Sequence, residues 1–220
     1  MRSDLETYGA LASSLGLRIL YVIDTHVHAD HISGGRALAE AIGAEYCLHS
    51  SAPAAFEFRG LEDGEMLDLG NVGIRVIHTP GHTPDSVCLA VVDRARGDEP
   101  WFLLTGDALL VGDAGRPDLS PERNVEAIYD SLHARLASLA DDVEVFPGHF
   151  SGSVCGRALS GKPSSTLGFE RRHNVAFEPR SLDAFRRFIM ESLPPKPAEF
   201  ERIVEANLGR TIEEDSDARS

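Results

Sequence analysis

Histidine and aspartate gather in short segments of this 220-residue chain, and the first segment is the densest. It holds His26, His28, Asp30 and His31 within residues 26–31. In an extended loop an i, i+2 pair points to one side, and the next two residues can turn back toward the same point. Imidazole nitrogen and carboxylate oxygen suit zinc, iron(II) or manganese. The segment therefore predicts a metal site, against the alternative of a solvated histidine-rich loop.

Three later segments each contribute one further candidate ligand. His82 lies in TPGHTPDS, Asp107 in LLTGDALL and His149 in FPGHFSG. Taken singly, the two histidines could be ordinary turn residues and the aspartate a helix N-cap. Taken with the first segment, they provide enough ligands for one or two metal ions. No cysteine stands in a CxxC pair, which argues against a cysteine-based zinc site.

The hydrophobic pattern predicts that these segments follow β-strands. Apolar runs predict strands at 19–23, 45–49, 72–78, 86–93, 101–107 and 143–146. Helical spacing of apolar residues predicts helices at 4–17, 35–42 and 121–139, a hairpin is expected within 57–71, and the pattern from 165 onward is helical. Alternating strands and helices predict an α/β (layered α+β) fold. If the strand ends lie together, the ligands converge on one sheet edge.

Composition narrows the class of protein. The chain has 21 Lys+Arg against 35 Asp+Glu, a net charge of −14, and this balance argues against nucleic acid or a membrane surface as partner. No apolar run approaches the roughly 20 residues of a membrane span, and no signal-like segment opens the chain. We expect a cytoplasmic protein with one domain over 1–208. Within it, 165–208 forms a C-terminal helical segment, and 209–220 is expected to be a disordered tail.

With these residues in view, the chain resembles the metallo-β-lactamase-fold superfamily. The HxHxDH segment at 26–31, then His82, Asp107 and His149, stand in the superfamily's order. TGDALLVGDAGRPDL (105–119) looks like the persulfide dioxygenase (sulfur dioxygenase) branch, and residues 147–174 are similar to bacterial members often fused to rhodanese. The resemblance implies an αββα sandwich. Relatives carry further strands ahead of the position of Met1, so it also implies a fold truncated at the N-terminus.

The resemblance implies a role for each candidate residue. His26, His82 and Asp107 would hold one iron(II) per chain, while His28, Asp30, His31 and His149 would orient ligands, handle protons or complete a second metal site. Arg116 and Arg172 would bind the substrate's carboxylates. The substrates would be O2 and a low-molecular-weight thiol persulfide, glutathione persulfide or similar, yielding sulfite and thiol. Further expected partners are a second copy of the chain and a separate rhodanese-type sulfurtransferase.

Two other functions remain open from the sequence. One is a zinc-dependent hydrolase of the glyoxalase II (hydroxyacylglutathione hydrolase) type, with one or two zinc ions. The other is a truncated, non-catalytic metal-binding or interaction protein. Glyoxalase II and the mitochondrial-type dioxygenases have a tyrosine shortly after the last histidine of the motif set. At that place this chain has His149-Phe150-Ser151. Coenzyme A persulfide is therefore a further candidate substrate. Four other histidines are expected not to bind metal: His49, His78, His133 and His173.

Overall fold

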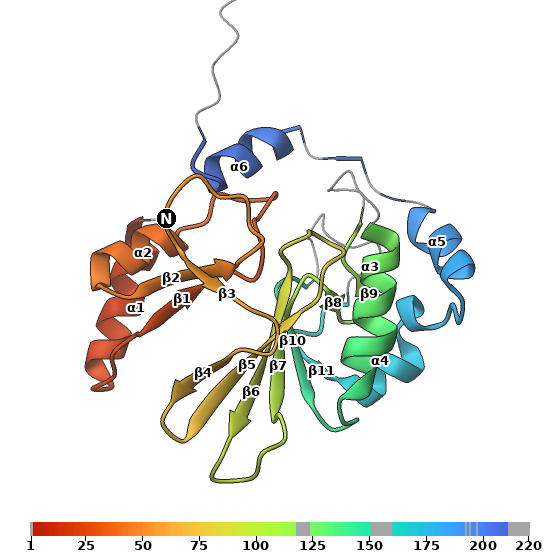
Figure 1. The fold of residues 1–220 in the computed structure, drawn as a ribbon, viewed down its shortest axis with the longest axis horizontal. Helices are drawn as coiled ribbons and strands as arrows, with labels where there is room; N and C mark the ends of the chain where they lie inside the picture. Colours follow the sequence, from red (N-terminus) through yellow and green to blue (C-terminus); the bar gives the residue numbers. More distant parts are fainter. Residues whose placement is uncertain are drawn as a thin grey trace, which may run out of the picture.

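Two β-sheets pack against each other in the computed structural model, with helices on both outer sides (Figure 1). The structure describes residues 2–117, 124–150, 160–191, 193, 195–196 and 198–210. The described helices are α1 (Arg2–Ser14), α2 (Gly35–Ile42), α3 (Asn124–Asp130), α4 (Leu167–His173), α5 (Leu182–Met190) and α6 (Phe200–Asn207). The order helix, sheet, sheet, helix confirms the expected αββα sandwich.

The larger sheet brings three predicted strand ends together. It has the order β11-β10-β7-β6-β5-β4, and β5, β7 and β10 run in the same direction, so their carboxyl ends meet at one edge. The smaller sheet has the order β1-β2-β3, and a third pairing joins β8 to β9. The described strands are β1 (Tyr21–Ile23), β2 (Glu45–His49), β3 (Arg59–Leu61), β4 (Met66–Leu69), β5 (Val72–His78), β6 (Val87–Asp93), β7 (Phe102–Gly106), β8 (Leu109–Leu110), β9 (Asp113–Ala114), β10 (Glu144–Pro147) and β11 (Ser165–Thr166).

Two sequence predictions about strand pairing are wrong. The strand before His26 does not join the others at one sheet edge, because β1 belongs to the smaller sheet. The hairpin expected within 57–71 does not form, since β3 pairs with β2 and β4 pairs with β5. Leu61 and Leu67, both buried, enter one hydrophobic core from the two different sheets. The chain therefore crosses between the sheets at this point.

The predicted helix at 121–139 is confirmed over its described part. α3 continues through a π-helical turn, Ser131–Arg135, and a 3₁₀ turn, Leu136–Ser138, while Pro121 lies outside the described residues. Its apolar face is buried at Ile128, Leu132 and Leu136. The ring of His133, on the same helix, is half-buried and stacks on Tyr129 with ring centroids 4.3 Å apart.

The C-terminal helices divide between two parts of the molecule. Leu167, Phe185 and Ile189, from α4 and α5, pack into the core beneath the larger sheet. α6 lies apart from them, over the loops that follow β1 and β2 (Figure 1), where Leu208 packs against Val27. Among the described helices, none is long and apolar enough to cross a membrane.

The smaller sheet covers only part of the larger sheet's inner face. Leu89 packs between the sheets, but its cross-strand neighbour Leu104 is 38% exposed and Phe146, next to it on β10, is 37% exposed. β1 forms one edge of the smaller sheet within the described part of the chain.

Neighbouring leucines on β7 test this arrangement. Leu103 is fully buried and Leu104 is 38% exposed. Leu103→Ala should lower the free energy of unfolding by about 2–5 kcal/mol, because it leaves a cavity in the core. Leu104→Ala removes the same atoms from a partly solvated face and should cost clearly less. Urea denaturation followed by circular dichroism measures both, and equal losses would contradict the assignment of the two faces.

Candidate metal centre

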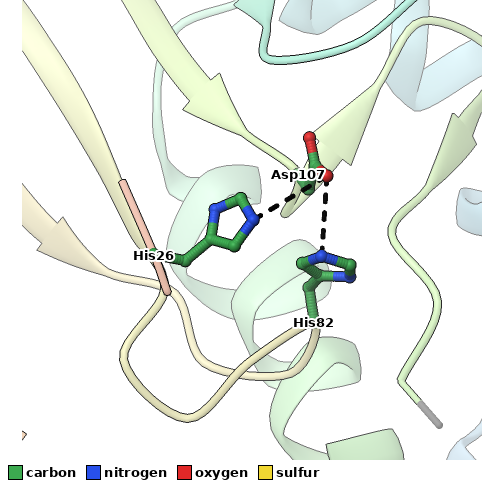
Figure 2. Close-up of side chains that lie close together, drawn as sticks. All are labelled: His26, His82 and Asp107. Atoms are coloured by element: carbon green, nitrogen blue, oxygen red, sulfur yellow. Dashed lines mark ion pairs between the residues drawn. The ribbon is translucent and has the colours of Figure 1, made fainter. Parts of the chain in front are cut away.

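Three buried side chains from separate elements converge at the edge of the larger sheet. His26 lies in the loop after β1, His82 in the turn after β5, and Asp107 directly after β7 (Figure 2). Nε2 of His26 lies 3.9 Å from Oδ2 of Asp107, and Nε2 of His82 lies 3.5 Å from the same oxygen. Their potential ligand atoms all lie within 4.8 Å of one another. This is the ligand set that the sequence resemblance implied.

Hydrogen bonds on the far side of each imidazole orient the ring. Nδ1 of His82 lies 3.0 Å from the carbonyl oxygen of Arg116, and a carbonyl can only accept, so Nδ1 donates and Nε2 is the nitrogen left for a metal. Nδ1 of His26 shares a hydrogen bond with the Thr25 hydroxyl at 3.0 Å. Such partners fix the tautomer and the ring direction of metal-binding histidines. Both Nε2 atoms are therefore available on the side that faces Asp107.

The electrostatics of this cluster keep the carboxylate charged and His26 neutral. Burial alone would raise the pKa of Asp107, but a hydrogen bond from His149 and the neighbouring imidazoles outweigh it and lower that pKa. Burial lowers the pKa of His26 well below its ordinary value, and the nearby His28 and His82 rings lower it further. A neutral imidazole and an ionised carboxylate are the forms that bind metal.

A second group, His28, Asp30 and His31, lies beside the first. Potential ligand atoms of these three also lie within 4.8 Å of one another, but the group is more exposed. Nδ1 of His31 lies 3.0 Å from Oδ1 of Asp30, while Nδ1 of His28 is buried without a hydrogen-bond partner. An unpartnered buried nitrogen is costly, and a bound cation would satisfy it.

His149 joins the two groups. Its Nδ1 lies 2.8 Å from Oδ1 of Asp107 and its Nε2 lies 2.9 Å from Oδ2 of Asp30. Ionised carboxylates only accept, so both ring nitrogens donate and the ring is an imidazolium. The hydrogen bond to Asp107, followed by that to Asp30, raises the pKa of His149 to about 10.

The residues present fit a divalent cation at His26, His82 and Asp107. Two nitrogens and one ionised oxygen point at one another, and each histidine has an oriented far side. Gly115 contributes by its lack of a side chain, because a Cβ there would collide with the backbone carbonyl of Asp107. A 2-His-1-carboxylate set is the facial triad of non-haem iron(II) oxygenases and leaves coordination positions open.

The two predicted substrate-binding arginines lie in different surroundings. Arg116 is 3% exposed, and its backbone directly supports His82. Arg172 is exposed on α4, where Nη1 lies 3.6 Å from Oδ2 of Asp141, a residue that precedes β10. Since His149 follows the other end of β10, the structure does not bring Arg172 to the metal cluster.

The remaining histidines stay outside both groups, as expected. His49 and His78 stack on each other with ring centroids 3.9 Å apart, and His173 contacts Phe169 on α4. One supporting residue went unrecognised in the sequence. Asp85 is buried, and its Oδ2 accepts a hydrogen bond from the backbone N–H of Val27 at 2.8 Å. Its place three residues after His82, in the same turn motif, is the signal that could have identified it.

The chain is similar to known enzymes of two kinds. The mitochondrial persulfide dioxygenase ETHE1 of Bos taurus is 31% identical over 198 residues, which are 90% of this chain and 72% of the relative. A hydroxyacylglutathione hydrolase of Polaromonas sp. is 35% identical over 149 residues, 66% of this chain and 54% of the relative.

Solved structures agree with these relatives. The crystal structure of ETHE1 from Myxococcus xanthus has a TM-score of 0.79 and 30% identity, covering 94% of this chain and 84% of that one. A metallo-beta-lactamase from Staphylococcus aureus has a TM-score of 0.86 and 31% identity. It covers 96% of this chain, which spans 64% of the length of that structure. Residues 5–149 match the family model of the metallo-beta-lactamase superfamily. The chain therefore belongs to the metallo-β-lactamase superfamily, and within it to the relatives of the ETHE1 persulfide dioxygenases.

Proposed function

We propose that this protein is a persulfide dioxygenase that uses one iron(II) per chain. The observation that carries the proposal is that only some of the candidate ligands have nitrogen atoms that are free to bind a metal. His26, His82 and Asp107 converge with both Nε2 atoms available, whereas both nitrogens of His149 are already hydrogen-bonded to carboxylates. One complete facial triad remains, and this arrangement leaves three coordination positions open for substrates.

Bound iron(II) would supply a site where persulfide sulfur and O2 meet and where electrons pass from sulfur to oxygen. The balanced reaction, RSSH + O2 + H2O → RSH + SO3²⁻ + 2 H⁺, releases protons. His149 and Asp30 form a hydrogen-bonded path from the buried Asp107 toward the surface, and the side chain of His149 is 21% exposed. We assign proton transfer to this pair. His28 and His31 flank Asp30, with Nδ1 of His28 3.8 Å and Nδ1 of His31 3.0 Å from its Oδ1.

A persulfide of a small acidic thiol, such as glutathione, needs a cation near the metal. We assign this role to Arg116, whose position in the chain next to the cluster supports it: its backbone carbonyl contacts His82, and the preceding Gly115 packs against Asp107. Arg172 does not enter the proposal, since it lies beside Asp141. The carrier thiol stays open between glutathione and coenzyme A, because Phe150, which follows the last histidine, offers no phenolic hydroxyl.

A second candidate function is a zinc-dependent thioester hydrolase. The observation that favours it is the second group, His28, Asp30 and His31, with its unpartnered buried nitrogen. A second zinc ion there, beside one at the first group, would give a two-metal hydrolytic site. The hydroxyacylglutathione hydrolases among the similar proteins support this alternative.

The choice of metal and reaction can be tested directly on the purified protein. Loaded with iron(II) and given glutathione persulfide, it should consume O2 and release sulfite in equal amounts. The zinc-loaded protein should consume none, because zinc has no redox chemistry. An oxygen electrode measures the O2 consumed, and a sulfite assay measures the product released. A zinc-loaded protein that hydrolyses a glutathione thioester, with no O2 uptake by the iron form, would favour the hydrolase.

Asp107→Asn tests the shared ligand. The substitution keeps the size of the side chain but removes the charge, so iron(II) affinity and oxygen uptake should each fall by at least about a hundredfold. Loss of a group that only supports a ligand typically costs up to about that much, and loss of a ligand's charge should cost more. Asp68→Asn, on an exposed edge strand, is the matched control and should change neither. Wild-type turnover in Asp107→Asn would refute the assigned metal centre.

His149→Ala separates the two candidate functions. A mononuclear site at His26, His82 and Asp107 does not include this imidazole, so the variant should still bind one iron(II) per chain while turning over more slowly. A two-metal hydrolase would lose one of its two ions. Metal content is measured by atomic emission after gel filtration, with His173→Ala, an exposed histidine outside both groups, as control.

A further inference from the structure

Asn207 connects the C-terminal helix to the loop that carries the first ligand segment. It is the last residue of α6. Its Nδ2 donates to the carbonyl oxygens of His28 and His31, both at 2.8 Å. Its Oδ1 accepts from the backbone N–H of Ser33 at 2.9 Å. One amide side chain thus contacts three backbone groups that lie between 174 and 179 residues away in the sequence.

Two of these contacts hold the backbone on either side of Asp30, the carboxylate of the second group. The carbonyls of His28 and His31 lie on either side of Asp30 in the chain, so holding both fixes the turn between them. Asp30 in turn accepts from Nε2 of His149 at 2.9 Å, and Nδ1 of that ring contacts Asp107 at 2.8 Å. A continuous set of contacts therefore leads from α6 to the buried metal ligand.

Apolar packing alone does not fix this turn. A cavity of about 570 Å³ lies where α6 faces the loop, lined by Val27 and Ala29 from the loop and by Val204 and Leu208 from the C-terminal segment. Apolar side chains therefore do not fill all the space between α6 and this loop. Among neutral side chains, only asparagine and glutamine offer both an acceptor oxygen and two amide hydrogens. The three contacts of Asn207 use all of these groups.

We propose that Asn207 is a positioning residue for the metal centre, acting through the 28–33 turn on the orientation of Asp30, and through His149 on Asp107. This inference rests on the proposed metal centre but not on the choice between dioxygenase and hydrolase. Loss of a partner that directly contacts a metal ligand typically lowers metal affinity by about 10–100-fold. Asn207 acts through further contacts, so we expect an effect at the lower end of that range.

The test uses cobalt(II) as the probe, since its visible absorption reports ligand geometry without any turnover. Asn207→Leu keeps the approximate shape of the side chain but removes all three contacts. The dissociation constant for cobalt(II), from competition with a chelator, should rise about tenfold. The absorption bands of the bound ion should also shift, because Asp30 and His149 no longer hold Asp107 in the same orientation.

Two further variants separate positioning from simple stability. Asn207→Asp keeps the acceptor for Ser33 but presents carboxylate oxygens to both carbonyls. It should weaken cobalt binding as well, although its added negative charge alone would favour a cation. Val204→Ala loosens the packing of α6 and leaves the three hydrogen bonds in place, so it should keep the wild-type dissociation constant and spectrum.

The outcomes are distinct. Wild-type affinity and spectrum in Asn207→Asp would overturn the proposal, whether or not Asn207→Leu folds. An equal loss in Val204→Ala would also overturn it, since docking of the helix would then explain the effect. Failure of the wild-type protein to bind cobalt(II) would refute the metal centre itself and, with it, the proposed function. Weakened binding confined to the Asn207 variants supports the proposal.

Discussion

The rest of the structure depends on keeping one carboxylate ionised in a place that water hardly reaches. Asp107 is 1% exposed, and an isolated buried charge would cost several kcal/mol. The chain meets this cost by surrounding the carboxylate with imidazoles from three different segments, His26, His82 and His149. A metal ion at the same place would add the positive charge that such a buried cluster favours. The same imidazoles that stabilise the buried carboxylate therefore also set the geometry of the candidate metal ligands.

The convergence of these side chains on Asp107 requires the two sheets to lie at a fixed distance from each other. His26 follows a strand of the smaller sheet, whereas the other residues around Asp107 follow strands of the larger one. Two hydrogen bonds hold the segments together. Val87 N–H donates to the backbone carbonyl of Thr25 at 2.8 Å, and Val27 N–H donates to Oδ2 of the buried Asp85 side chain at 2.8 Å. On the opposite side, Gly81 has φ +143°, and a Cβ there would collide with Ile128 of α3. The turn that bears His82 can therefore lie directly on the helix layer.

Sequence patterns predicted those parts of the site that depend on local order along the chain. Strands ending just before His82, Asp107 and His149 follow from apolar runs. Their common direction arises because the antiparallel β6 lies between β5 and β7, and because α3 separates β7 from the parallel β10. The pairing of β3 and β4 could not be predicted from a polar stretch, because burial of Leu61 and Leu67 against different strands decides it. The location of Arg172 depends on which way α4 faces, and Asn207 contacts a loop at the other end of the chain. Such long-range contacts leave no periodic or motif signal.

The two candidate metal groups are not equally ready to bind an ion. The first group needs no rearrangement, since both Nε2 atoms already face the carboxylate. A second ion at the other group would draw on His149, whose two nitrogens are both engaged by Asp107 and Asp30. Recruiting that ring would break at least one of these hydrogen bonds and release a proton, a cost that a mononuclear site avoids. These hydrogen bonds of His149 favour a single ion at His26, His82 and Asp107, and in the proposed mechanism they leave the Asp30–His149 pair for proton transfer.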